Sequence, residues 1–299
     1  MKKRTLFALA LLLFLVGITA AQDVLVEYVE GTVELRGLRG WSELYIGDTL
    51  PIDATVRLRD GGLLELRSGE RTYLISRGGT YGLPSIIDTG ERNSAAGIGA
   101  VARRGLRRLV TEEDRRPTTA VAGVRADEAV DRSEVTWAGG ESVSELIEEG
   151  LTLLGEDAVE DAYYLFYDAW EYAGTEDLPR TQFYLGYSAY LIGSRAEALG
   201  YLQSPPPDPD TPFYDDHLLT LTQILVESFD YAGAKELLNG YLSGASPEGA
   251  DLQSAYLLGG LAYEGEGEVD EARDFFEQAR QVDPESEFGQ LAASFIAEM

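Results

Sequence analysis

Few side chains in this sequence have the types and the spacing that catalysis or metal binding requires. The chain has one histidine, His217, and no cysteine. His217 follows Asp215 and Asp216 and lies near Asp208 and Asp210, a set that could bind calcium or a transition metal. The spacing matches no standard metal-binding loop, so an aspartate that caps the start of a helix is the favoured interpretation. We therefore expect no metal and no cofactor.

No complete catalytic motif is visible in the sequence either. With one histidine, placed on a predicted repeat helix, no Ser–His–Asp triad can be argued. Residues 97–102, GIGAVA, match a dinucleotide-binding loop, but no buried strand precedes them and no βαβ pattern surrounds them. Carboxylates are abundant, so two that are close in sequence do not indicate an acid–base pair. We expect a protein that is not an enzyme.

The C-terminal half of the chain has the periodicity of paired helices. Residues 251–284 form one complete helix–turn–helix pattern, closed by Pro284. Small and aromatic residues share each helix: Tyr256, Gly260 and Tyr263 on the first, and Ala272, Phe276 and Ala279 on the second. Small residues let two helices approach closely. One such pair cannot bury its own apolar face, so further copies are expected.

Those copies lie upstream at nearly constant spacing. Intervals of 36, 36 and 38 residues separate the small residues that open the second helices, Ala162, Ala198, Ala234 and Ala272. This pattern resembles the tetratricopeptide repeat, which is about 34 residues long, over residues 143–284. The resemblance implies an α-helical solenoid at residues 141–299, with four repeats and a capping helix that carries Phe288 and Phe295.

In tetratricopeptide arrays the first helices line a concave groove, and the resemblance implies that a partner binds there. Projected onto this sequence, the groove is lined by Arg180, Phe183, Tyr187, Tyr190, Leu219, Gln223, Leu257 and Leu261. Tyrosine suits peptide binding, because its ring buries area while its hydroxyl keeps a hydrogen bond. The alternative is that some of these aromatic residues pack between repeats.

The N-terminal half has the period of two that is typical of strands. Between residues 24 and 83, apolar residues such as Val56 and Leu58 alternate with polar ones, and Leu64 and Leu66 alternate with Glu65. Glycine-containing turns at 60–62, where a hairpin is expected, and at 68–70 divide the strands. Short strands at such intervals predict a compact antiparallel sheet or barrel.

Several stretches of this half resemble the FecR-type domain of bacterial envelope proteins. They are residues 31–33, Trp41, residues 44–48, 56–58 and 60–62, and the block PTTAVAGVR at 117–125. The resemblance implies a non-catalytic β domain over residues 22–138, with a last strand at 135–137. The expected fold class is therefore α+β multidomain, with a FecR-like antiparallel domain before the helical solenoid.

A basic insertion interrupts the predicted β domain at about residues 89–116. It carries Arg103, Arg104, Arg107 and Arg108, and residues 100–109 could form a short helix. Such a cluster can contact a polyanion, a cell-wall glycan or a membrane surface. The alternative is a linker or an arm that docks on the acidic half of the same chain. No aromatic residues are interleaved with the arginines for stacking on bases.

Residues 1–21 have the pattern of an export signal. Lys2, Lys3 and Arg4 precede an apolar run at residues 6–16, and small residues at 19–21 suit cleavage before Gln22. The run is short for a membrane span, although a retained helical anchor is the alternative. The expected location is the periplasm or the cell surface, with no membrane span in the mature chain.

The charge of the chain is concentrated in its helical half. The net charge is −28, and residues 141–299 hold 33 acidic and 5 basic side chains. Such a surface repels nucleic acid and anionic lipid. The sequence therefore predicts an envelope scaffold that binds a protein or peptide through its helical repeats, with the FecR-like domain as a second binding module. The alternative is glycan or polyanion binding through the β domain and the arginine cluster.

Overall fold

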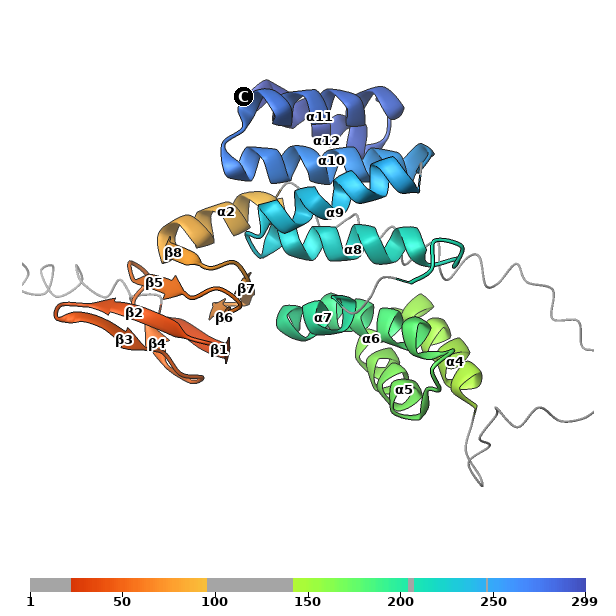
Figure 1. Ribbon diagram of the computed structural model, residues 1–299, viewed down its shortest axis with the longest axis horizontal. Coiled ribbons are helices and arrows are strands. Elements are labelled where there is room, and N and C mark those ends of the chain that lie inside the picture. The colour runs from red at the N-terminus through yellow and green to blue at the C-terminus, as the bar shows by residue number, and fades with distance from the viewer. Residues whose placement is uncertain (1–22, 96–141, 204–206, 246) are drawn as a thin grey trace, which may run out of the picture. The chain divides into compact units, whose positions relative to one another are not determined.

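The protein consists of an antiparallel β region followed by helices. The computed structural model describes residues 23–95, 142–203, 207–245 and 247–299 (Figure 1). Within them, two compact units are present. The β unit holds residues 23–73 and 78–88, and the helical unit holds residues 74–77, 89–95 and the described residues from 142 onward. The expected α+β order, with strands before helices, is confirmed.

The strands form two four-stranded sheets, in the orders β4-β1-β6-β7 and β3-β2-β5-β8. The pairs β1–β4, β1–β6, β2–β3, β2–β5 and β5–β8 are antiparallel. The bounds are β1 (Val24–Glu30), β2 (Val33–Gly37), β3 (Gly40–Glu43), β4 (Thr49–Leu50), β5 (Thr55–Leu58), β6 (Leu63–Ser68), β7 (Arg71–Ile75) and β8 (Gly79–Gly82).

The predicted alternation holds along most strands, with one exception. Val56 and Leu58 are buried and Arg57 between them is not, as the period of two requires. On β6, Leu64 and Leu66 are buried, but Glu65 is also buried, with 8% of its surface exposed. The expectation that Glu65 faces outward is therefore wrong. The second face of β6 is thus covered at Glu65, whereas Arg67 on the same face is exposed.

The turn at residues 60–62 does not close a hairpin. Gly61 has φ +75°, a conformation that glycine adopts without strain, and the Gly62 N–H donates to the Arg59 carbonyl (2.9 Å). However, β5 and β6 belong to different sheets, so this turn carries the chain from one sheet to the other. Turn chemistry fixes the change of direction but not the pairing partner, which explains why the hairpin prediction was wrong.

A helix that the sequence analysis did not predict follows β8. It is α2 (Leu83–Ala95), where Leu83 and Ile86 are buried three residues apart and Pro84 lies in the first turn. The short helix expected at residues 100–109, the block at 117–125 and the strand at 135–137 lie outside the described residues.

The helical unit is built from successive antiparallel helices that pack as pairs, α4 with α5, α6 with α7, α8 with α9 and α10 with α11, while α12 packs on α11 (Figure 1). The bounds are α4 (Val143–Gly155), α5 (Val159–Tyr172), α6 (Leu178–Ile192), α7 (Arg195–Leu202), α8 (Tyr214–Glu227), α9 (Tyr231–Gly244), α10 (Gly249–Glu266), α11 (Val269–Val282) and α12 (Glu287–Glu298).

Several helices begin and end at residues suited to that role. Ser142 caps α4 through a capping box, in which its hydroxyl accepts from the Glu145 N–H (3.3 Å) and its own N–H donates to the Glu145 side chain (2.6 Å). Ser286 caps α12 in a simpler way, by accepting from the Gly289 N–H (3.0 Å). Gly193 and Gly267 end α6 and α10 in the left-handed conformation.

Three of the four helix pairs have a close contact between a glycine on the first helix and a large residue on the second. A Cβ atom added to Gly150 would lie 2.4 Å from Phe166, one added to Gly186 would lie 2.8 Å from Leu202, and one added to Gly260 would lie 2.4 Å from Phe276. The equivalent positions in the third pair are Thr222 and Leu238, both buried. The Thr222 hydroxyl donates to the Leu218 carbonyl (2.7 Å), which keeps this polar group paired in the interior.

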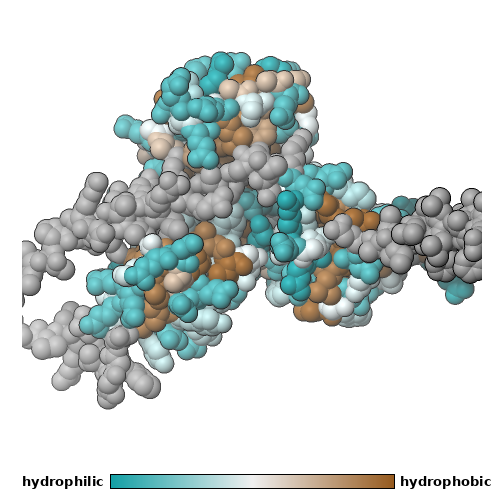
Figure 2. All heavy atoms as spheres, turned by 180° about the vertical axis from the view of Figure 1, so that it is seen from behind, coloured by the Kyte–Doolittle hydropathy of each residue, from teal (hydrophilic) through white to brown (hydrophobic). Residues whose placement is uncertain are grey.

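The four alanines that defined the repeat spacing are buried at these interfaces. Ala162, Ala198, Ala234 and Ala272 are each 0% exposed, on α5, α7, α9 and α11. The face of the molecule in Figure 2 shows hydrophilic residues interspersed with hydrophobic ones, as expected when each helix buries one side and solvates the other. The helices are therefore held together by their periodic small and large residues.

Replacement of Gly260 by alanine should destabilise the helical unit. The new Cβ would collide with Phe276, which is fully buried and stacked on Phe295 with ring centroids 4.9 Å apart, so the ring cannot move away. We expect a loss of about 1–3 kcal/mol in the free energy of unfolding. The measurement is chemical denaturation of the full chain followed by circular dichroism.

Gly240→Ala is the matched control. Gly240 lies inside α9 with open space around its Cα, so the substitution should stabilise the protein by about 0.5–1 kcal/mol through helix propensity. If both variants shift stability in the same direction, close helix contact at Gly260 is not what holds the pair.

Candidate functional site: the first helices of the repeats

The residues predicted to line a groove come from the first helices of three pairs. Arg180, Phe183, Tyr187 and Tyr190 lie on α6, Leu219 and Gln223 lie on α8, and Leu257 and Leu261 lie on α10. These helices are neighbours, since α8 contacts both α6 and α10. The structure therefore brings the predicted residues into one row of helices.

Seven of the eight side chains are buried in this row. Phe183, Tyr187, Gln223 and Leu257 are 0% exposed, and Tyr190, Leu219 and Leu261 are at most 8% exposed. Only Arg180 among the eight is partly open, and its guanidinium lies 5.7 Å from the centroid of the Tyr184 ring. In this structure the seven side chains pack inside the protein. For the aromatic residues among them, this is the alternative stated above, in which they pack between repeats. Their contact with a partner stays a prediction that requires the helices to expose them.

A buried polar network links the second and third helix pairs. The Tyr190 hydroxyl on α6 donates to Glu227 Oε1 (2.8 Å) on α8, and Gln223 Nε2 donates to the Tyr190 hydroxyl (2.6 Å) and to Glu227 Oε1 (2.9 Å). Arg195 Nε, on α7, donates to Glu227 Oε2 (3.2 Å). One carboxylate thus collects donors from three helices, which fixes α6, α7 and α8 relative to one another.

The same network keeps Tyr190 protonated. Burial raises the pKa of Tyr190 well above its usual value of 10.0, and the nearby charge of Glu227 raises it further. Tyr190 therefore acts as a neutral donor at every ordinary pH. Sequence reasoning found Tyr190 and Gln223 but missed Glu227 and Arg195. The signal that could have shown Glu227 is its position four residues after Gln223, on the same side of α8.

Tyr190→Phe should weaken the protein, because it leaves Gln223 and Glu227 each short of one buried hydrogen bond. We expect a loss of about 1–3 kcal/mol in the free energy of unfolding, measured by chemical denaturation. The control is Tyr164→Phe, since Tyr164 is 67% exposed, and its stability should change by less than about 0.5 kcal/mol. Equal midpoints for the two variants would contradict a stabilising network.

An aromatic cluster surrounds the N-terminal end of α8. Phe183 stacks on Phe213, with ring centroids 5.1 Å apart and planes at 13°, and also lies 5.9 Å from the His217 ring. Phe166 and Tyr184 continue the cluster toward the first pair, 5.3 Å apart. Packed rings, rather than an open surface, therefore occupy the space between the first helices.

His217 lies at the start of α8, directly after Asp215 and Asp216 of the first turn, as expected, and its ring is buried in this core. Its exposure is 4%, and neither ring nitrogen makes a hydrogen bond of good geometry to the described residues, although the Leu202 backbone lies near enough to oppose part of the effect of burial on the His217 pKa. Helix α8 begins after Phe213 without a side-chain cap. Asp215 instead accepts a hydrogen bond from the Tyr241 hydroxyl (2.8 Å). The expectation that an aspartate caps α8 is therefore wrong. Among the described residues no cluster of side chains could hold a metal ion.

The buried histidine should make the protein sensitive to acid. Burial lowers the pKa of His217 from 6.5 to about 4, so the unfolded chain takes up a proton between these values and the folded chain does not. The stability that depends on neutral His217 is fully present above about pH 6.5 and is lost as the pH falls toward 4. The loss should be on the order of 3 kcal/mol.

His217→Phe keeps a ring at this place and removes the titrating group. Chemical denaturation at a series of pH values between 7 and 4 should show a shallower acid decline for this variant than for the original protein. Identical slopes would show that His217 does not titrate on unfolding.

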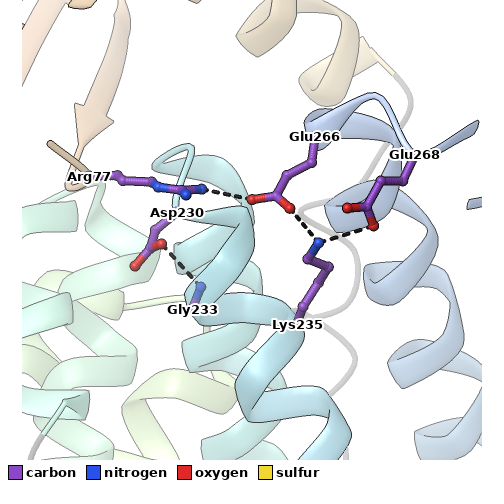
Figure 3. Close-up of polar contacts among 6 residues, drawn as sticks. All are labelled: Arg77, Asp230, Gly233, Lys235, Glu266 and Glu268. Carbon is purple, nitrogen blue, oxygen red and sulfur yellow. Dashed lines mark hydrogen bonds and ion pairs between the residues drawn. The ribbon is translucent and has the colours of Figure 1, made fainter. Parts of the chain in front are cut away.

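Charged residues connect the third and fourth pairs (Figure 3). Lys235 on α9 forms ion pairs with Glu266 at the end of α10 and with Glu268 before α11 (3.2 Å for the latter). Arg77 Nη1 also pairs with Glu266, at 2.8 Å. Hydrogen bonds from Lys235 and Arg77 lower the pKa of Glu266, so this carboxylate contributes stability above its unfolded pKa of about 4.5 that is lost as the pH falls.

The predicted polyanion contact cannot be placed. Arg103, Arg104, Arg107 and Arg108, like the glycine-rich stretch at 97–102, lie outside the described residues. In the part of the chain that the structure describes, no helix is long and apolar enough to cross a bilayer.

Comparison with known proteins identifies no family. No protein-family model matches the chain, and no curated protein has a significantly similar sequence. Among solved structures, the "MamA RS-1 ArsTM double mutant" has a TM-score of 0.42 and 17% identity, over 52% of this chain and 91% of that one.

Two further MamA structures give similar values. "MamA 41-end" from Desulfovibrio magneticus RS-1 has a TM-score of 0.42 and 16% identity, over 52% of this chain and 92% of that one. A "crystal structure of MamA protein" has a TM-score of 0.39 and 19% identity, over 67% and 91%. With TM-scores below 0.5, these similarities carry no argument about the function of this chain.

Proposed function

We propose that this protein is a non-catalytic scaffold of the bacterial cell envelope that binds a protein or peptide partner through its helical repeats. The observation that carries this proposal is the repeated close contact of Gly150, Gly186 and Gly260 with large residues, with the buried pair Thr222 and Leu238 at the equivalent positions of the third helix pair. Helix pairs that stack in this way present an extended surface, whose main use in proteins is recognition. We assign the pairs to the tetratricopeptide type on the same pattern.

The location in the envelope rests on the sequence alone. The basic residues Lys2, Lys3 and Arg4, the apolar run and the small residues before Gln22 support export. The assignment of the β unit to the FecR type is likewise a proposal, supported by the sequence stretches at 31–33, 44–48 and 56–62. In this proposal the β unit is a second binding module.

The charge of the helical unit favours a protein over nucleic acid as the partner. Residues 141–299 hold 33 acidic and 5 basic side chains, a balance that repels phosphate backbones. Arg180 is the most accessible of the projected groove residues, and partly exposed arginines beside aromatic rings are frequent binding hot spots. We therefore place the first partner contact at Arg180, at the start of α6.

Affinity capture from an envelope extract tests this proposal. The mature chain, immobilised, should retain a defined protein partner, and a photo-crosslinking residue in place of Arg180 should join to that partner. Arg180→Glu should weaken its binding about tenfold or more, as loss of an arginine hot spot does. Arg280 is the matched control, because it is an exposed arginine on α11, and Arg280→Glu should leave binding unchanged.

Two outcomes would contradict the proposal. One is that no envelope protein is retained in a way that depends on residues 141–299. The other is that the two arginine variants lose the partner equally, which would indicate a diffuse charge effect and not a binding face.

A further inference from the structure

The outer surface of the first helix pair carries aromatic residues that the repeat itself does not require. Four positions of each second helix can be compared, which follow its buried alanine by one, two, five and eight residues. On α5 they hold Tyr163, Tyr164, Tyr167 and Trp170. On α9 they hold Lys235, Glu236, Asn239 and Leu242, and on α11 they hold Arg273, Asp274, Glu277 and Arg280. The α9 and α11 pairs form with mainly charged and polar residues there. On α7 the first of these positions is Leu199, which is fully buried, so packing accounts for a large residue at Tyr163 but not for rings at the other three positions.

The rings on α5 form one cluster with Tyr201 of α7. Ring centroids are 5.9 Å apart for Tyr167 and Trp170, and 5.6 Å apart for Trp170 and Tyr201. Tyr163 contacts Tyr164 edge to face at 5.6 Å, and Tyr164 is 67% exposed. The other four rings are half-buried, so each keeps part of its surface open to solvent.

The indole N–H of the tryptophan in this cluster is unfavourably placed. The Trp170 indole N–H is closed to solvent and has no acceptor among the described residues. Burial of an unpaired donor is unfavourable, and an apolar ring at this position would avoid it. Packing against Tyr167 and Tyr201 would be available to an apolar ring without this cost, so a use in binding accounts for tryptophan at this position.

Acidic side chains surround the cluster, and no basic side chain accompanies them on this helix pair. Glu197 of α7 accepts a hydrogen bond from the Tyr163 hydroxyl, and Asp168 and Glu171 are exposed on α5. Residues 143–177 contain eleven acidic side chains and no lysine, arginine or histidine. On α7, Arg195 is already paired with Glu227. The charge of this surface thus complements a cation.

The neighbouring helix is short beside this surface. Helix α7 has 8 residues, whereas α5, α9 and α11 each have 14. Helix α7, the second helix of the next pair, therefore ends at Leu202, one residue after Tyr201, whose ring contacts Trp170. In the described part of the chain α7 does not continue along α5 beyond that contact, although α4 and α6 both pack on α5.

We propose that this aromatic–acidic surface, formed by Tyr163, Tyr164, Tyr167, Trp170, Tyr201 and Glu197, binds an arginine-bearing segment of a partner protein. A guanidinium can stack flat on a tyrosine or tryptophan ring while its N–H groups donate to a carboxylate. Lysine can do this less well, because its ammonium is a compact, strongly hydrated charge. A second copy of the helical unit is a poor occupant, since both surfaces would be acidic.

This inference rests on the proposed function and names the chemistry of the partner, and the residues it uses lie on α5 and α7 and do not include Arg180. Its test needs only the purified chain and defined peptides. The peptide test can therefore fail while capture of an envelope partner at Arg180 succeeds. Capture can also fail while the peptide binds, so the two proposals are tested separately.

The test measures binding of a labelled synthetic peptide with several arginines separated by glycine and serine, by fluorescence anisotropy. The same peptide with lysine in place of arginine should bind more weakly. Tyr164→Ala combined with Tyr167→Ala should weaken the arginine peptide about tenfold, the effect of losing stacked cation–aromatic contacts. Circular dichroism of each variant confirms that its helices are retained.

A second variant tests the carboxylates with a matched control. Asp168→Lys with Glu171→Lys changes two exposed residues near the end of α5, where lysine suits the helix dipole. It should weaken binding at least as much as the tyrosine variant. Asp274→Lys with Glu277→Lys makes the same change in net charge on α11 and should leave most of the binding intact. Equal weakening by the two lysine pairs, or unchanged binding by the tyrosine variant, would overturn the proposal.

Discussion

The helical unit depends on one contact, in which a small residue on the first helix of a pair meets a large buried residue on the second. At Gly260 and Phe276 the helices approach so closely that not even a methyl group fits between them. The same close approach occurs at Gly150 with Phe166 and at Gly186 with Leu202, so it recurs at the repeat interval along the chain. The anchor alanines of the second helices are fully buried beside these contacts, as close packing of helix pairs requires.

This dependence explains what the sequence could predict. Glycine and alanine positions opposite large residues leave a periodic signal, so the helix pairs could be placed from the order of residues alone. Strand pairing leaves a weaker signal. Gly61 shows where the chain turns, but nothing local indicates that β5 and β6 join different sheets. Helix α2 was missed because its buried residues, Leu83 and Ile86, directly follow a strand pattern and carry little periodicity of their own.

The site was predicted less well than the fold, for a physical reason. A helix position that faces a groove and one that faces a neighbouring repeat have the same period, so Phe183 and Tyr187 satisfied both interpretations. Long-range polar contacts such as Arg195 with Glu227 depend on how helix pairs are stacked, which the spacing of one pair does not reveal. The aromatic residues of α5 could have been recognised by comparing equivalent outer positions between repeats rather than within one helix.

The last helix has a consequence for assembly. Phe295 of α12 stacks on Phe276, so it occupies the face of α11 on which another helix pair would be added. Repeat proteins that leave such a face bare can join head to tail and grow into open-ended filaments. Here the apolar side of that terminal layer is already filled by the chain itself. Polymerisation through this end would require α12 to detach and expose its buried phenylalanines.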